Sequence, residues 1–330
     1  MESKGVSKLS IWLITGATGT FGKEALNQIL SMDSHARVRC LSRDEVKQSV
    51  MQRSIKPEDK NRVIFMLGDV REPERLRRAM DGADYVLHAA ALKRIEKVQS
   101  DVRESFLTNC LGSLNVAEIS HQSGVISSVL ISSDKACSPI NTYGVTKLMA
   151  EHLFQNTGNS YGGSRTRLNA VRYGNVWGST GSLIEYIKSA KANNSKIEIS
   201  SLNATRFFFS IKCAVKLAIW AALCGNNGSI YVPKLKSANL ATIIEAADVD
   251  FRLTGIKANE KLHECLISEC EMERSSSFYL KNIDLEVWEI PKQTNDPMDF
   301  SQGIDYHSGM SEKISAEIIE RAFVDDSTTF

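Results

Sequence analysis

Short apolar runs alternate with amphipathic stretches along the first 178 residues of the chain. This alternation is typical of β-α units that build a parallel sheet. Six of the runs are expected to be strands, over residues 10–15, 36–42, 62–68, 84–90, 127–133 and 167–174. Six such strands with helical patterns between them predict an α/β fold with a doubly wound, Rossmann-type parallel sheet.

The chain after Gly178 follows a different pattern. The glycine- and serine-bearing segment 178–182 leads into shorter mixed elements, which predict a smaller α/β lobe packed on the strand ends. The most apolar stretch there, 213–224, is far shorter than the ~20 residues of a membrane-spanning helix and carries Lys216, so we expect a core helix. We therefore predict two domains, over 1–178 and 179–330.

Composition and charge narrow the classes of function. Forty basic and thirty-nine acidic side chains leave a formal net charge of +1, which argues against binding to nucleic acid or to an anionic membrane. The seven cysteines are scattered without a C-x-x-C motif, which is typical of neither a disulfide framework nor a zinc site. The first residues lack the apolar core of a signal peptide. We therefore expect a cytoplasmic protein in a reducing environment.

A glycine-rich turn joins the first expected strand to the helix after it. Gly16, Gly19 and Gly22 give the spacing G-x-x-G-x-x-G. Such a turn brings backbone amides against a pyrophosphate at the positive end of the helix, and a Cβ at these positions would block the approach. The sequence therefore predicts a dinucleotide site, in which the glycines are accompanied by Thr18, Thr20 and Phe21.

The end of the second expected strand indicates which dinucleotide binds. An acidic residue there would take the ribose 2′-hydroxyl of NAD, but this chain has Ser42 and Arg43, followed by Lys47. Cations at this point suit the 2′-phosphate of NADP. NADP is therefore favoured over NAD, although Asp44 places a carboxylate in the same segment.

Further cofactor contacts are expected after the third and fourth strands. Asp69, with Val70 beside it, is offered to the adenine amine, and Ala89 and Ala90 are small residues on which the cofactor can lie flat. His88 precedes them and is expected to pack within its strand rather than act as a catalyst or a ligand.

Tyr143 and Lys147 are four residues apart, on one face of the helix that follows Pro139. An ordinary phenol has a pKa near 10, and lowering it by roughly 3 units for a base at neutral pH needs about 4 kcal/mol. One ammonium group about 5 Å away supplies about 3 kcal/mol at an effective dielectric constant near 20. With Ser132 and Ser133 closing the preceding strand, the pattern predicts a tyrosine base activated by a lysine.

Together these motifs resemble the extended short-chain dehydrogenase/reductases. Within that group, the chain resembles the inverting UDP-N-acetylglucosamine 4,6-dehydratases in the segments SRDEVKQ, GDVREPERL, HAAALKR, SSDKACSPINTYGVTKL, RYGNVWGS, VPKLKS and NEKLHE. The likeness runs from about Trp12 to about Glu271. Its most specific element is Asp134 followed by Lys135, at their spacing from Tyr143.

The resemblance implies a redox-neutral removal of water from UDP-N-acetylglucosamine. Tyr143, with Lys147 and the nicotinamide, oxidises C4, which acidifies the C5 proton. The implied base for that proton is Lys135, the implied acid for the leaving C6 hydroxyl is Asp134, and Ser133 belongs to the same implied catalytic set. Return of the hydride to C6 gives a UDP-4-keto-6-deoxy sugar, and a proton delivered from the other face would invert C5.

The pairing of Asp134 with Lys135 carries two physical tensions. Opposite charges favour an ionised acid and an ammonium, whereas this chemistry needs a protonated acid and a neutral amine. Adjacent residues of a regular strand also point to opposite faces. The chain must therefore leave strand geometry near Ser133 if both side chains are to face the substrate.

The resemblance also implies residues that grip the nucleotide sugar. It places Lys93 and Asn109 at the cofactor, and it places at the substrate Lys93, Tyr173, Asn175, Arg206 and Glu260. The fork of Arg206 suits a diphosphate. The chain departs from the family pattern in the second lobe at Thr180, Glu185, Ala204 and Lys257, and before it at residues 94–96. The identity of the sugar is therefore less secure than the chemistry.

Two alternatives stay open, a 4-epimerase on the same scaffold and a non-catalytic NADP-binding sensor. No metal is expected, because no ligand spacing fits His263, Glu264, Cys265 and Cys270. The expected partners are a UDP-sugar and further copies of the chain, as a dimer or a hexamer.

Overall fold

The computed structural model describes residues 9–158, 165–292 and 304–325. Its main feature is a nine-stranded sheet with the order β14-β15-β10-β6-β5-β4-β1-β2-β3. Neighbouring strands from β3 to β10 pair in parallel, and β15 and β14 are added antiparallel at one edge. The nine strands are β1 (Ile11–Thr15), β2 (Arg37–Ser42), β3 (Val63–Leu67), β4 (Tyr85–His88), β5 (Ser127–Ile131), β6 (Arg167–Val171), β10 (Ile230–Pro233), β14 (Ser276–Leu280) and β15 (Leu285–Ile290).

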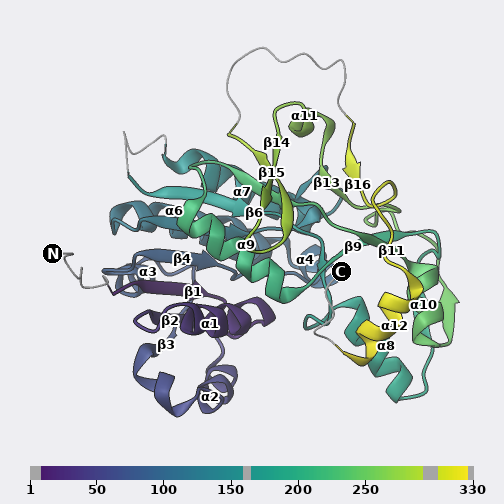
Figure 1. Ribbon diagram of the computed structural model, residues 1–330, viewed down its shortest axis with the longest axis horizontal. Coiled ribbons are helices and arrows are strands. Elements are labelled where there is room, and N and C mark those ends of the chain that lie inside the picture. The colour runs from purple at the N-terminus through teal and green to yellow at the C-terminus, as the bar shows by residue number, and fades with distance from the viewer. Residues whose placement is uncertain (1–8, 159–164, 293–303, 326–330) are drawn as a thin grey trace.

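Helices cover both faces of this sheet (Figure 1). One face carries α1 (Thr20–Met32) and α9 (Ile211–Cys224), which pack against each other. The other carries α3 (Pro73–Met80), α6 (Gly112–Gln122) and α7 (Thr142–Thr157). Short helical segments link these elements, namely α2 (Glu45–Arg53), η1 (Pro57–Arg62), α4 (Ile95–Ser100), α5 (Val102–Ser105), η2 (Phe106–Leu111) and η3 (Asp134–Ala136).

Burial explains why the central strands read as continuous apolar runs. Trp12, Leu13 and Ile14 of β1 are all buried, because a strand inside a doubly covered parallel sheet has no face exposed to water. The doubly wound α/β fold predicted from the chain is confirmed, and so is the core helix predicted over 213–224, which is α9. The predicted strands are present but shorter, since the runs 84–90 and 127–133 end at His88 and Ile131.

A smaller lobe lies at the carboxyl ends of the parallel strands (Figure 1). It has its own hydrophobic cluster, to which Trp177, Ile187, Phe208 and Ile243 contribute. Its helices are α8 (Leu183–Ala192), α10 (Leu240–Ala247) and α12 (Ala316–Val324), with α11 (Glu269–Met272) nearby. Its strands form small sheets, namely β7 (Asn175–Val176) with β9 (Thr205–Phe209) and β11 (Ser237–Asn239), β8 (Ile197–Ile199) with β12 (Phe251–Leu253), and β13 (Cys265–Ile267) with β16 (Tyr306–His307).

The chain crosses between the two lobes more than once. After β9 it returns to the large sheet as α9 and β10, and it returns again as β14 and β15. The part after Gly178 therefore builds the smaller lobe and also completes the large sheet. Within the described ranges, no helix combines the length and the apolar character that a membrane span requires.

Candidate active site

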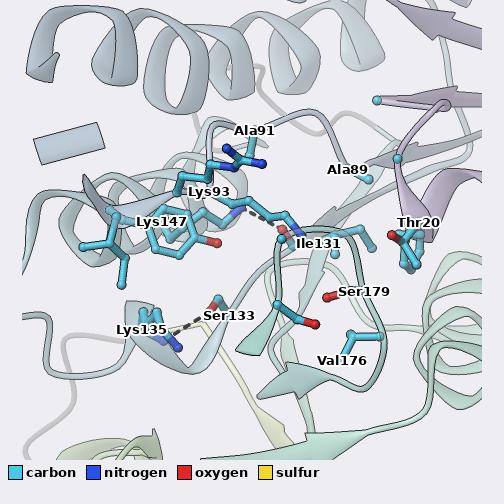
Figure 2. Close-up of a pocket in the computed structure, with 18 of the residues that line it drawn as sticks. Thr20, Ala89, Ala91, Lys93, Ile131, Ser133, Lys135, Lys147, Val176 and Ser179 are labelled. Carbon is cyan, nitrogen blue, oxygen red and sulfur yellow. Dashed lines mark hydrogen bonds between the residues drawn. The ribbon is translucent and has the colours of Figure 1, made fainter. Parts of the chain in front are cut away.

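Side chains from both lobes line one cavity of about 1610 Å³. It lies where β1 to β6 end, because the residues that follow each of these strands contribute to its wall. Figure 2 shows Thr20 and Ala89 at one end of this cavity and Ser133 and Lys135 at the other. In an open α/β sheet, this edge is where ligands bind.

The glycine-rich turn forms the first end of the cavity. Gly16 has a φ of +68°, and a Cβ there would lie 2.8 Å from the backbone nitrogen of Ala90. Only glycine therefore permits both the left-handed conformation and the close approach of β4. Gly19 ends the turn, and α1 begins at Thr20 with its first amides open toward the cavity. This cradle fits a dinucleotide pyrophosphate.

The basic residues expected at the ribose lie on the wall of the same end. Arg43 is half-exposed, and its Nη1 lies 3.3 Å from Oδ2 of Asp69. Asp44 is the N-cap of α2, where its carboxylate accepts from the Lys47 amide at 2.9 Å and lies 3.0 Å from the Lys47 ammonium. The negative charge of Asp44 is therefore engaged at the start of its own helix, and the Arg43 guanidinium lies between Asp69 and Glu104, 3.8 Å from the Glu104 carboxylate.

His88 packs inside the sheet, as expected for a strand histidine. Its two ring nitrogens lie 2.7 Å from Oγ1 of Thr15 and 3.0 Å from Oγ of Ser113. Burial, together with the charge of Lys147, lowers the pKa of its imidazole to about 3. His88 is therefore a neutral structural residue at physiological pH.

The pair Tyr143 and Lys147 lies on the cavity-facing side of α7. Asn141 caps the helix by accepting from the Gly144 amide at 2.9 Å, and Nζ of Lys147 donates to the Ile131 carbonyl at 2.7 Å (Figure 2). Burial lowers the pKa of Lys147 to about 8, although the nearby Glu151 carboxylate acts to raise it. The lysine can thus lose its proton close to neutral pH.

The environment of Tyr143 differs from the sequence-based picture in one respect. Burial raises the pKa of its phenol, and the Lys135 ammonium and a hydrogen bond with Ser133 act in the opposite direction. The cation that opposes burial at Tyr143 is therefore Lys135, from the turn after β5, whereas Lys147 holds the carbonyl of Ile131.

The chain leaves strand geometry where the acid-base chemistry requires it. After β5 ends at Ile131, the short turn η3 begins at Asp134, whose amide donates to the Tyr173 carbonyl at 2.9 Å. Gly144 allows α7 to pack on this turn, since a Cβ there would collide with the carbonyl of Lys135. The expectation that the strand ends before Asp134 is confirmed.

The two charged residues of this turn are placed differently. Lys135 lines the cavity, and its side chain is 17% exposed. Asp134 is 0% exposed and is not among the described residues that line the cavity; its Oδ1 accepts from Ser133 at 2.9 Å and from Nζ of Lys135 at 3.0 Å. In this structure the carboxyl group predicted as the acid therefore lies behind the lysine and does not face the cavity.

A second carboxylate accompanies Lys135. Oε1 of Glu264 lies 3.4 Å from Nζ of Lys135, and Glu264 lines the cavity. Burial raises the pKa of Asp134, and Glu264 raises it further despite the opposing charge of Lys135. Burial alone would lower the pKa of Lys135, but Asp134 and Glu264 together raise it. The pKa of both groups is therefore above its ordinary value, and the charge of each acts on the other.

Sequence reasoning considers Glu264 only as a metal ligand and misses its place beside Lys135. In the part of the chain that the structure describes, no three His, Cys, Asp or Glu side chains are grouped to hold a metal ion. The sequence signal that could have found it is weak, a charged residue directly before the short apolar strand β13.

The expected substrate residues come from both lobes, since Arg206 and Glu260 belong to the smaller lobe and Lys93 follows β4 of the large sheet. Arg206 is buried in β9, where its Nη2 lies 3.1 Å from Oε1 of Glu260. Glu260 also accepts from Ser200 at 2.7 Å. Tyr173 and Asn175 follow β6 and line the same cavity. Burial lowers the pKa of the Lys93 ammonium, although Glu185 acts to raise it.

Most of the predicted site residues share this cavity. The predicted residues that do not line it are Asp134, Gly22 and Asn109. Gly22 packs against Ala17. The Asn109 side chain bonds the backbone of Leu92 and Oγ1 of Thr146, so it holds the segment after β4 against α7. The cavity-lining polar residues that sequence reasoning did not place there include Ser132, Arg94, Asn259, Lys261 and Glu264.

A buried ionic network of Arg172, Glu151 and Glu271 lies next to the site. Arg172 follows β6 and is fully buried, and its guanidinium donates to Glu151 at 2.6 Å and to Glu271 at 2.8 Å. Glu151 also accepts from Oγ of Ser132 at 2.5 Å. The network therefore ties the end of β5 to α7 and to the smaller lobe, and so it keeps Lys135 and Tyr143 on facing elements.

The sheet and this cavity define a protein with a Rossmann-type fold, which the solved dehydratase and epimerase structures of similar shape share. Residues 12–283 match the family described as polysaccharide biosynthesis protein. The inverting UDP-N-acetylglucosamine 4,6-dehydratase of Campylobacter jejuni subsp. jejuni serotype O:23/36 (strain 81-176) is 36% identical over 269 residues, or 81% of this chain and 80% of that protein. The chain therefore belongs to the polysaccharide biosynthesis family that includes this dehydratase, as its motifs indicated.

One further relative and one solved structure are also similar to this chain. The UDP-glucose 4-epimerase of Rickettsia felis (strain ATCC VR-1525 / URRWXCal2) is 33% identical over 272 residues, which cover 80% of this chain and 79% of that protein. The X-ray structure of Pen from Bacillus thuringiensis superimposes with a TM-score of 0.87 at 29% identity, covering 97% of this chain and 98% of that one. The likeness to Pen therefore includes the smaller lobe as well as the large sheet.

Proposed function

We propose that this protein is a nucleotide-sugar dehydratase that removes water from UDP-N-acetylglucosamine, with NADP as its cofactor. The observation that carries the proposal is that Lys135, Tyr143 and Lys147 line one cavity with the glycine-rich turn. Oxidation at C4 by hydride transfer accounts for Tyr143 and Lys147 of α7, because the hydroxyl must lose its proton to a base. A 4-epimerase has no use for a further base, and Lys135 is placed to be one.

The residues of the cavity divide the reaction between them. The glycine-rich turn at Gly16 and Gly19 would hold the dinucleotide, which would supply the hydride acceptor for C4 and the hydride donor for C6. Tyr143 takes the proton of the C4 hydroxyl. Ser133 forms a hydrogen bond with the Tyr143 phenol, and Lys147 donates to the carbonyl of Ile131 beside it. Lys135 then takes the C5 proton, which the C4 ketone has made acidic. Asp134, whose pKa is raised by burial, is the acid implied by the family resemblance.

The sugar nucleotide would span the cavity from the catalytic turn to the smaller lobe. Arg206 offers a charged fork to the diphosphate, and Glu260 holds that fork in place at 3.1 Å. Tyr173, Asn175 and Lys93 are the other proposed substrate contacts. We propose accordingly that residues 1–178 mainly bind the dinucleotide and that 179–330 mainly bind the substrate. A cytoplasmic location and a homo-oligomeric assembly, as a dimer or a hexamer, belong to the same proposal.

Incubation of the protein with UDP-N-acetylglucosamine and NADP tests this function. We expect a product lighter than the substrate by one water, detected by mass spectrometry. A product of unchanged mass but altered configuration at C4 would instead identify a 4-epimerase, the activity named for the Rickettsia relative. Cofactor binding without turnover of any UDP-sugar would identify a sensor. The coupling constants of the dehydrated product would report whether C5 is inverted.

The choice of NADP over NAD rests on Arg43. Replacement of Arg43 by alanine is expected to weaken NADP binding by about 10-fold or more, because one charge-assisted bond to the 2′-phosphate is lost. NAD binding should change by less than about threefold, since NAD has no phosphate there. Calorimetric titration of both dinucleotides measures the difference. Arg53→Ala, which removes the same charge outside the cavity, is the control. An equal loss for both dinucleotides would contradict the assignment.

A further inference from the structure

Glu264 is held rigidly at the wall of the cavity. Its amide donates to Oγ of Ser308 at 2.9 Å, and its carbonyl accepts from the Ser308 amide at 2.8 Å. The strand that follows, β13, pairs with β16, and the preceding residue His263 forms a bridge with Thr205 of β9. Because the backbone is fastened on both sides, the direction of the Glu264 side chain is set by the fold.

The side chain of Glu264 is buried yet faces the cavity. The residue is 4% exposed, and it is part of the cavity wall. Its Oε1 lies 3.4 Å from Nζ of Lys135 and 3.9 Å from Nε of Arg206. Its Oε2 is buried and has no hydrogen-bond partner among the described residues. A buried carboxylate oxygen without a hydrogen-bond donor lowers the free energy of unfolding. A ligand in the cavity that donates to this oxygen would remove that cost.

Glu264 and Asp134 occupy different positions around the same amine. Both carboxyl groups lie within 3.4 Å of Nζ of Lys135. Of the two, Glu264 belongs to the cavity wall, whereas Asp134 is 0% exposed behind Lys135. A hexose bound beside Lys135 would therefore meet the carboxyl group of Glu264 first.

The resting charges of Lys135 and Glu264 define the proton transfer that this chemistry requires. Burial acts to raise the pKa of Glu264, but Lys135 and Arg206 hold it below its ordinary value, so the carboxylate is ionised at rest. Lys135 is protonated at rest because its two carboxyl neighbours raise its pKa despite burial. A proton that moves from Nζ of Lys135 to Oε1 of Glu264 leaves a neutral amine and a neutral acid, and the net charge of the pair is unchanged.

We propose that Glu264 is a further catalytic residue, which contacts the hexose, receives the proton of Lys135 and delivers it to the hydroxyl that leaves from C6. This role rests on the proposed function, because it presumes that water is removed. In the elimination, the Lys135 amine takes the proton from C5, and the electrons of that C–H bond form the C5–C6 double bond. The C6–O bond breaks with its electron pair, and the Glu264 carboxyl proton completes the departing water. Lys135 ends as ammonium and Glu264 as carboxylate, which restores the resting state.

The test compares Glu264→Gln with Asp134→Asn and with the unchanged enzyme in single turnovers. Three signals are followed, the absorbance of the reduced nicotinamide for C4 oxidation, exchange of the C5 hydrogen in D2O, and the mass loss of one water. For Glu264→Gln we expect water loss to slow by about 100-fold or more, with the reduced nicotinamide still formed, since glutamine keeps the shape and cannot carry the proton. Glu260→Gln, which changes a cavity carboxylate bound to Arg206, should raise KM instead.

Other outcomes overturn the assignment. Water loss by Glu264→Gln within about threefold of the unchanged enzyme, or a rise in KM at constant kcat, would leave Asp134 as the acid or Glu264 as a binding group only. If Glu264→Gln does not bind the dinucleotide, Glu264→Asp and Glu264→Asn are compared, and the aspartate must dehydrate at least about 10-fold faster than the asparagine. An unchanged enzyme that removes no water would overturn the proposed function itself, a result distinct from an active enzyme indifferent to Glu264.

Discussion

Replacement of Lys135 by alanine is expected to slow water loss by about 1000-fold or more while C4 oxidation persists. The amine of Lys135 faces the cavity, whereas Tyr143 and Lys147 belong to α7, so C4 oxidation loses only the help that the Lys135 charge gives to the Tyr143 phenol. The variant should therefore oxidise the sugar and then stop, because no base of the same reach takes the C5 proton. Accumulation of enzyme-bound reduced nicotinamide, without a product lighter by one water, is the measurement.

A matched variant separates the charge of Lys135 from its basicity. Lys135→Arg keeps a positive charge between Asp134 and Glu264, but a guanidinium does not release its proton at accessible pH. It should therefore be as inactive in dehydration as Lys135→Ala. Lys234→Ala, which removes an exposed lysine paired with Glu286, is the control with unchanged turnover. Dehydration by Lys135→Ala at a rate near that of the unchanged enzyme would refute its role as the base.

The largest effect on stability is expected from Arg172→Met. The guanidinium is fully buried between the carboxylates of Glu151 and Glu271, and methionine would leave both without a cation. Breaking a buried ion pair by removal of one partner costs about 3–5 kcal/mol, because the remaining charge stays buried. Urea-induced unfolding should show a lower midpoint, and since Ser132 bonds Glu151, turnover should fall as well.

A surface ion pair provides the comparison for Arg172. Nζ of Lys234 lies 2.9 Å from Oε2 of Glu286, and the two side chains are 56% and 37% exposed. Lys234→Met should change the free energy of unfolding by at most about 1 kcal/mol, because water screens and replaces an exposed pair. Similar losses for Arg172→Met and Lys234→Met would show that the buried network does not hold the site together.

The local features of this site could be predicted because they depend on near neighbours in the chain. The turn at Gly16 needs a left-handed residue with no Cβ, and that requirement is visible as a glycine after an apolar run. Tyr143 and Lys147 share a helical face by their spacing alone. The end of β5 before Asp134 was also visible in the chain, because the run expected as a strand stops at Ser133.

The contacts that couple distant segments could not be predicted in this way. Glu264 directly precedes β13 in the smaller lobe, and no residue near it in the chain indicates that Lys135 lies 3.4 Å away. Arg172 and its partner Glu271 are likewise joined across 99 residues. The return of the chain as α9 and β10 is another such case, because an apolar helix shows that it is buried but not against which sheet.

The sequence by itself determined the fold class, the dinucleotide turn and the spacing of Tyr143 and Lys147, because each follows from the backbone and side-chain preferences of neighbouring residues. Only the tertiary structure decided that Asp134 lies behind Lys135 and that Glu264 stands on its cavity side. The reason is that burial and charge pairing are properties of what surrounds a side chain in space, and most of those surroundings come from remote parts of the chain.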